Sequence, residues 1–192
     1  MPFSSLQQLL TSQLRDLYSA ERQVLLIWPQ LAQQVRSSAL REAIESHRAE
    51  TGRQLARLIE ILDSLNQAAT GLRSRGMEGL LVELLTQLAA GNPSPVRDAA
   101  ILAGCQRVES YEMAGYSSTI SIARALDLPL AVRLLSATLS EEEAARRRLE
   151  MIATAEIHPA AIDHAVLART AIREAEAIPI TSARSLRGGL RA

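Results

Sequence analysis

The stretch that decides the fold is VESYEMAGY, Val108–Tyr116. It lies in a long segment whose apolar residues recur every three or four positions, as on one face of an α-helix. The stripe comprises Leu102, Cys105, Glu109, Glu112, Tyr116, Ile120 and Ala123. Glu109 and Glu112 therefore fall on the apolar face, where an ionised carboxylate is costly unless an opposite charge meets it. Because helical bundles often meet this cost with metal ions, the pair predicts a polar or metal-binding interior.

Composition narrows the class of protein. The chain has 192 residues, of which 21 are basic and 21 acidic, so no basic surface for nucleic acid is expected. The length suits one domain, and a single cysteine, Cys105, excludes an internal disulfide and fits a reducing compartment. The start, MPFSSLQQLL, lacks a basic leader, and no apolar run is long enough to span a bilayer. We therefore expect a soluble, cytoplasmic protein that binds neither nucleic acid nor membrane.

Apolar periodicity predicts an all-α protein, because no alternating run of β-branched residues indicates a strand. Four long helices are expected at about 5–35, 38–65, 95–126 and 130–155, with a kink or break at Pro29 in the first. A shorter amphipathic helix, Met77–Ala89, lies in the connection between the second and third. This layout predicts a ferritin-like antiparallel four-helix bundle with a short crossover helix.

The residues after the fourth helix are expected to be additions to the bundle. Pro159 opens an additional C-terminal helix over 156–178, which Pro179 ends. The last residues, TSARSLRGGLRA, are small and basic and contain glycine, so 179–192 is interpreted as a flexible tail. We thus divide the chain into a bundle (1–155), an additional helix and a tail. The tail's SLRG segment resembles short C-terminal peptides that dock cargo enzymes inside encapsulin-type shells; simple solvated disorder is the alternative.

Every one of the four long helices carries an ionisable residue on its apolar face near mid-length. A di-iron or di-manganese site needs carboxylates from different helices together with one or two imidazoles. The sequence therefore predicts a site for two iron or manganese ions, with the ligands Glu21, His47, Glu50, Glu109, Glu112 and Glu142.

Each of these residues also has an interpretation without metal. Glu109 and Glu112 would lie on a polar helix face that meets solvent or a partner chain, and His47 would be a hydrogen-bonded core histidine. Tyr116 is either a packing residue or a hydrogen-bond donor to a carboxylate. Spacing alone does not decide, because Glu42 and Glu45 share the i, i+3 spacing but lie off the stripe and are expected in solvent.

Several ordered blocks between Leu6 and Ala155 resemble the YciE/YciF family of stress-associated ferritin-like proteins, often labelled ferroxidases. The blocks are LYSAERQ (17–23), His47 with Glu50 and Thr51, MEGL (77–80), VRDAA (96–100), VESYEMAGY (108–116) and LSEEEA (139–144). The resemblance implies a homodimeric bundle similar to rubrerythrin, with a dinuclear metal centre. It further implies a ferroxidase or peroxide-detoxifying oxidoreductase, without establishing the reaction.

The chain departs from the ferritin-like pattern in one respect. Helices 2 and 4 of such sites usually carry Glu-x-x-His, which occurs nowhere in this sequence; Arg53 follows Glu50 by three positions and Arg146 follows Glu142 by four. If both arginines turned inward, they would neutralise the carboxylates by ion pairs. The alternative function is therefore a non-catalytic helical dimer with a metal-free polar core, acting as a structural or partner-binding stress protein.

Overall fold

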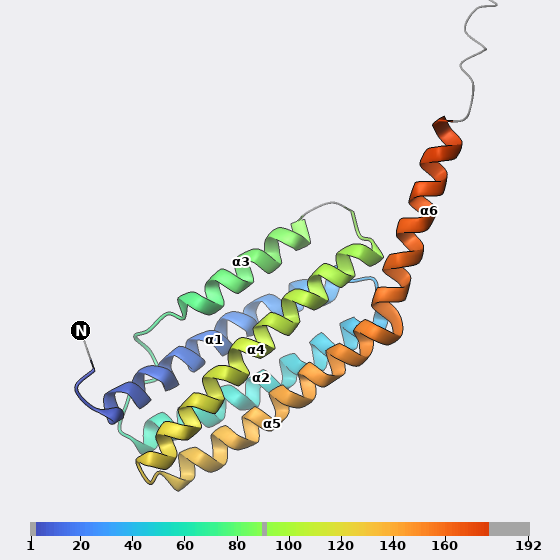
Figure 1. The fold of residues 1–192 in the computed structure, drawn as a ribbon. Coiled ribbons are helices and arrows are strands. Elements are labelled where there is room, and N and C mark those ends of the chain that lie inside the picture. Colours follow the sequence, from blue (N-terminus) through green and yellow to red (C-terminus); the bar gives the residue numbers. More distant parts are fainter. Residues whose placement is uncertain (1–2, 90–91, 177–192) are drawn as a thin grey trace, which may run out of the picture.

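The computed structural model describes residues 3–89 and 92–176, and this part of the chain is helical with short connections. Helices α1 (Leu6–Gln34) and α2 (Ser38–Ser64) form one antiparallel hairpin, and α4 (Pro95–Ala125) and α5 (Pro129–Ile152) form another (Figure 1). The hairpins pack through α1 against α4 and through α2 against α5. The all-α class and the ferritin-like four-helix bundle are therefore confirmed.

The connection between the hairpins contains α3 (Arg75–Ala89), which lies along the outer side of α1 and α4 (Figure 1). It carries the chain from the end of α2 back to the opposite end of the bundle, where α4 begins. The crossover helix expected at Met77–Ala89 is thus present and starts two residues earlier.

Side-chain caps and turn residues explain where the long helices begin and end. The hydroxyls of Ser5, Ser37 and Ser94 each accept a hydrogen bond from a backbone N–H in the first turn of α1, α2 and α4. Asn66 and Asp127 have φ of 54° and 52°, the left-handed conformation that follows many helix ends. Helix α1 continues through Pro29, so the break that proline was expected to cause there is absent.

The junction between α5 and the additional helix differs from the prediction. A π-helical segment, η1 (Ala153–Ile157), joins α5 directly to α6 (His158–Glu176), and the His158 N–H donates to the Ala153 carbonyl. Pro159 has no N–H to give to a carbonyl of the preceding turn, and the wider π turn accommodates that loss. The chain is therefore helical across the boundary placed near residue 155. Residues 177–178 of the additional helix and the 179–192 tail with its SLRG segment lie outside the described residues.

The interior is divided along the bundle into two apolar clusters. One contains Trp28, Leu40 and Leu149 and extends to α3, and the other contains Leu14, Leu58 and further side chains of α4 and α5 near the opposite end. Charged residues of the four long helices lie in the layer between them. No helix in the described part of the chain has the length and apolar character needed to cross a membrane.

Candidate metal centre

A layer of ionisable side chains crosses the middle of the bundle and is almost completely shielded from solvent. Its five most buried members are at most 3% exposed: Glu21 of α1, His47 of α2, Glu109 and Glu112 of α4, and Glu142 of α5. Helical periodicity places them there, because each lies on the same stripe as the leucines that form the apolar clusters. The structure therefore brings together five of the six residues proposed as ligands.

Four of these residues form a compact group. One ligand atom from each of His47, Glu109, Glu112 and Glu142 lies within 4.8 Å of all the others. The His47 Nε2 atom is 3.4 Å from Glu109 Oε1 and 3.6 Å from Glu142 Oε2. Three helices thus place one imidazole and three carboxylates around a single small volume.

Glu21 lies beside this group and is held by Tyr116. The Tyr116 hydroxyl donates a hydrogen bond of 2.6 Å to Glu21 Oε1, and both side chains are fully buried. Tyr116 is thus a donor to a carboxylate as well as a packing residue, so the two interpretations of it hold together. Burial and the nearby Glu21 charge raise the pKa of Tyr116 well above its usual value, so its hydroxyl stays protonated as a donor.

Glu50 occupies the rim of the layer. Its Oε2 atom is 3.4 Å from His47 Nδ1, and its side chain is 19% exposed. The hydrogen bond to His47 lowers the pKa of Glu50, so this acid is ionised more readily than an isolated glutamate. The interaction also orients the imidazole, because it holds one ring nitrogen outward and leaves Nε2 facing Glu109 and Glu142.

Gln54 is also a member of the layer, and it was not predicted from the sequence. It is fully buried, and its Nε2 atom donates to Glu142 Oε1 and, at 3.3 Å, to Glu141 Oε2. The apolar residue next to it, Leu55, is only partly buried. The available signal was spacing, since Gln54 follows His47 by seven residues, two helical turns, and so shares its face.

Burial dominates the electrostatics of the layer. It raises the pKa of Glu21, Glu109 and Glu112 well above the usual glutamate range, and the charge of Glu142 raises all three further. The pKa of Glu142 itself is also raised by burial, against the opposing effect of His47. Without a cation, these acids therefore keep their protons to a higher pH than an isolated glutamate does, and they titrate as a coupled group.

Many polar atoms in the layer have no hydrogen-bond partner. Both carboxylate oxygens of Glu112 are buried and unpaired, although most buried polar atoms in proteins are hydrogen-bonded. The other unpaired atoms of the layer are Glu21 Oε2, His47 Nε2, Gln54 Oε1, Glu109 Oε2 and Glu142 Oε2. Anionic oxygens with one imidazole are a donor set that suits iron or manganese, so the residues present fit a metal centre.

The two arginines of the metal-free alternative do not enter the layer. Arg53 and Arg146 are both exposed, and Arg53 Nη1 donates to the backbone carbonyl of Ala49. The alternative in which they neutralise the carboxylates is therefore wrong in its structural premise. Two other arginines bridge α2 and α5 near the layer: Arg57 pairs with Glu141 through contacts of 2.7 Å, and Arg148 Nη1 donates to Ser46 Oγ at 3.0 Å.

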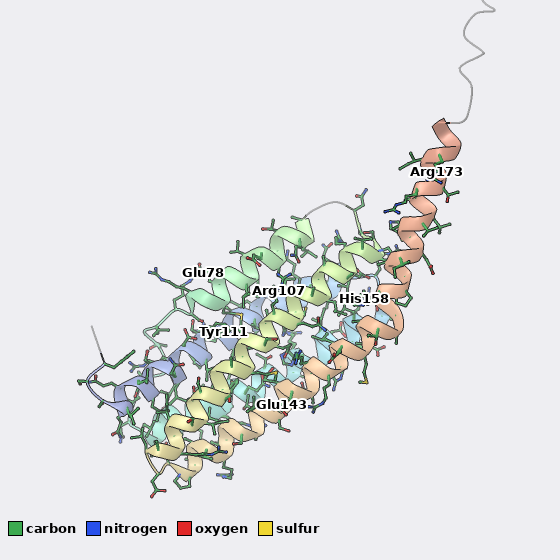
Figure 2. The ribbon with its side chains drawn as sticks, viewed as in Figure 1. Glu78, Arg107, Tyr111, Glu143, His158 and Arg173 are labelled. Atoms are coloured by element: carbon green, nitrogen blue, oxygen red, sulfur yellow. The ribbon has the colours of Figure 1, made fainter. Side chains whose placement is uncertain are left out.

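Two acids with the spacing of the buried pair lie in solvent, as expected. Glu42 and Glu45 are exposed, which confirms that helical phase separates them from Glu109 and Glu112 despite equal spacing. Glu143, adjacent to Glu142 and labelled in Figure 2, has a side chain that is 45% exposed. His158, labelled at the start of α6, and His164 are exposed and lie outside the layer.

The fold and the layer together define a class: a ferritin-like four-helix bundle with a buried carboxylate and histidine cluster at mid-length. The chain belongs to the family described as "Domain of unknown function (DUF892)", whose model matches residues 5–162. The YciF protein of Escherichia coli (strain K12) is 32% identical over 154 residues, covering 80% of this chain and 93% of YciF. The resemblance inferred from the sequence is thus confirmed.

Solved structures agree with this assignment. The crystal structure of the E. coli stress protein YciF matches with a TM-score of 0.76 and 31% identity, covering 79% of this chain and 96% of that one. YcfI of Rhodopseudomonas palustris, described as a candidate structural protein, matches with a TM-score of 0.73 and 34% identity, over 78% and 98% of the two chains. A protein of Xanthomonas campestris shares the fold with a TM-score of 0.62 at 20% identity, over 89% and 99%.

Proposed function

We propose that this protein binds two iron or manganese ions in the buried layer and acts as a ferroxidase or peroxide-detoxifying enzyme. The observation that carries the proposal is the unpaired state of Glu112, whose two buried oxygens lack any hydrogen-bond donor. Divalent cations would meet these oxygens and the other unpaired atoms of the layer, and would offset the cost of burying several carboxylates.

The proposed role of each residue follows from its position in the layer. His47, Glu109, Glu112 and Glu142 would hold metal directly, since their ligand atoms lie within 4.8 Å of one another. Glu21, oriented by the Tyr116 hydroxyl, would complete the side of the site that faces α1. Glu50 holds the imidazole in place from the partly exposed rim and is the sixth proposed ligand.

Bound ferrous ions would supply the electrons of the reaction. With two protons, the two electrons would reduce dioxygen to hydrogen peroxide, or hydrogen peroxide to two waters, and both ions would become ferric. The chain's own contribution is to hold the carboxylates in fixed positions, to exclude bulk water by the apolar clusters on either side, and to release the protons held by the acids when metal binds.

Metal analysis tests the proposal. Protein purified without chelators is expected to contain about two iron or manganese ions per chain, and the metal-free protein should take up the same number on anaerobic titration with ferrous ion. The double variant Glu109→Ala plus Glu112→Ala should lose this uptake, whereas Glu42→Ala plus Glu45→Ala, a pair with the same spacing on the surface, should keep it. Absence of stoichiometric metal in every preparation would refute the proposal.

The competing proposal is a non-catalytic stress protein, and the description of the R. palustris relative as a candidate structural protein favours it. In that case the acids would remain protonated in the folded chain. The two proposals differ in one measurement, since the non-catalytic protein would not consume peroxide when supplied with ferrous ion. In both proposals the protein is a cytoplasmic homodimer.

A further inference from the structure

A small cavity lies against the metal-binding layer on the side where α2 meets α5. His47 and Glu109 form its inner end, and its walls are mainly apolar, with Trp28, Ala43 and Ala145 among them. Its volume is about 10 Å³, close to the space that one water molecule needs. The cavity therefore gives a very small molecule a place beside two of the proposed metal ligands.

Among the residues that line this cavity, Arg148 alone is not fully buried, so it marks the side of the cavity that faces solvent. Arg148 of α5 lines the cavity and is only partly buried, and its Nη1 atom donates to the hydroxyl of Ser46 on α2 at 3.0 Å. Ser46 is exposed, so the Arg148–Ser46 hydrogen bond spans the two helices at the surface. Because such exposed hydrogen bonds contribute little net stability, this contact can open without unfolding either helix.

We propose that this cavity is the access site for a small neutral oxidant, of the size of dioxygen or hydrogen peroxide, and that Arg148 with Ser46 gates it. The apolar walls favour a molecule without charge, and the guanidinium group at the outer side opposes the passage of a cation. The small volume favours such a molecule over a hydrated metal ion or an organic substrate. The identity of the molecule as an oxidant rests on the proposed function; the gate does not.

The chain contains one tryptophan, Trp28, which is 1% exposed and lines the cavity. Trp28 also lines a wider surface depression beside Arg41 and Glu45, so access to the cavity is reported by the part of the fluorescence quenching that changes with the cavity's own lining. No bound metal is needed for this measurement. Quenching by dissolved dioxygen, measured from fluorescence lifetimes on the metal-free full-length protein, gives a bimolecular rate constant that can be compared between variants.

Four variants separate the gate from general loosening of the fold. Arg148→Ala should raise the quenching constant roughly twofold or more by removing the closing side chain, and Ser46→Ala should raise it less, because only the acceptor is lost. Ala145→Val should lower it by occupying the cavity. Arg147→Ala is the matched control. Arg147 is exposed, and its Nη1 atom lies 3.8 Å from Glu143 Oε2, away from the cavity, so this variant should leave the quenching constant unchanged.

An equal constant in Arg148→Ala and wild type, or an equal rise in Arg148→Ala and Arg147→Ala, would overturn the gate. The oxidant is tested separately on iron-loaded protein, where Arg148→Ala should speed ferrous oxidation and Ala145→Val should slow it, with unchanged iron content. Dioxygen and peroxide are distinguished by which of the two gives the altered rate. If iron does not bind while the quenching constants change as expected, the proposed function fails and the gate stands.

Discussion

Glu112 is the residue on which the account depends most strongly. Its side chain is fully buried, its oxygens have no donor, and the acids around it are Glu21, Glu109 and Glu142. A group in this position stabilises the fold only when a proton or a cation compensates its charge. The same side chain should therefore be a liability in the metal-free protein and a ligand in the metal-bound one.

The variant Glu112→Gln should stabilise the metal-free protein at alkaline pH. The pKa of Glu112 is raised in the folded state. At pH values above the usual pKa of a glutamate, the folded chain therefore binds more protons than the unfolded chain, and the free energy of unfolding falls as the pH rises. At about pH 8 the variant should be more stable than wild type by on the order of 1–3 kcal/mol, and at about pH 5 the difference should shrink. Urea unfolding at both pH values measures it.

Glu45→Gln is the control for this comparison, since Glu45 is exposed on α2. Its free energy of unfolding should stay within about 0.5 kcal/mol of wild type at either pH. A Glu112→Gln difference that does not grow with pH would contradict the buried-acid account.

At the scale of single residues, the sequence predicted members of the buried layer wherever a charged residue interrupted an apolar stripe. Glu21, Glu109, Glu112 and Glu142 stood out for that reason, and all four are buried. Gln54 was not recognised because an uncharged amide resembles a surface residue, and its partner Glu142 lies 88 residues away in the chain. Which side chains of two helices meet depends on how the helices are rotated relative to each other, and the periodicity of one helix does not predict that rotation.

At the scale of elements, the turn between α1 and α2 is held by a residue of α4. The buried carboxylate of Asp98 accepts hydrogen bonds from the backbone N–H of Arg36, at 3.0 and 3.1 Å to its two oxygens, and of Ser37, at 2.9 Å. Asp98 therefore satisfies backbone donors at a helix start and fixes where α2 begins relative to α4. Because α2 carries His47, this contact also positions the metal-binding layer.

Asp98→Ala should destabilise the protein by about 2–3 kcal/mol, because it leaves the buried N–H of Ser37 and the partly buried N–H of Arg36 without acceptors. Thermal unfolding of the metal-free protein measures the loss. Asp63→Ala is the matched control, as Asp63 is exposed near the end of α2. An Asp98→Ala midpoint equal to that of the control would contradict the assigned role.

Helix positions were largely predictable, since long apolar stripes and serine caps define them locally. The start of α4 at Pro95, just after its Ser94 cap, was expected from the proline-containing connection before it. The π-helical segment at Ala153–Ile157 was not, because proline was assumed to separate two helices. A proline stops a helix only when the preceding turn cannot rearrange, and here the turn widens instead.

At the scale of the whole molecule, α6 projects beyond the bundle (Figure 1). Its residues Ile162, Val166, Leu167 and Ile172 are each more than half exposed, so much of the apolar surface of α6 is uncovered in the single chain. The family model ends at residue 162, so most of α6 lies beyond the region that the model matches. We expect a homodimer in which α6 contributes apolar contact surface.

A chain ending at Asp163 should keep the folded bundle, with a melting temperature within about 4 °C of the full-length protein. The reason is that the α6 side chains removed are exposed wherever the structure describes them. Its metal content should be unchanged, and sedimentation should show a shift from dimer towards monomer. A full-length monomer, or a truncated chain that dimerises equally well, would contradict the role of α6 in association.

The most direct measurement of the central claim is a crystal structure of the protein loaded with manganese, with anomalous scattering used to locate the ions. Two anomalous peaks are expected between the two apolar clusters, within coordination distance of His47, Glu109, Glu112 and Glu142, with Glu21 at the second peak. Anomalous peaks only at the protein surface would contradict the claim that this layer is a metal centre. The absence of any peak in the layer, in crystals grown from protein fully loaded with manganese, would contradict it as well.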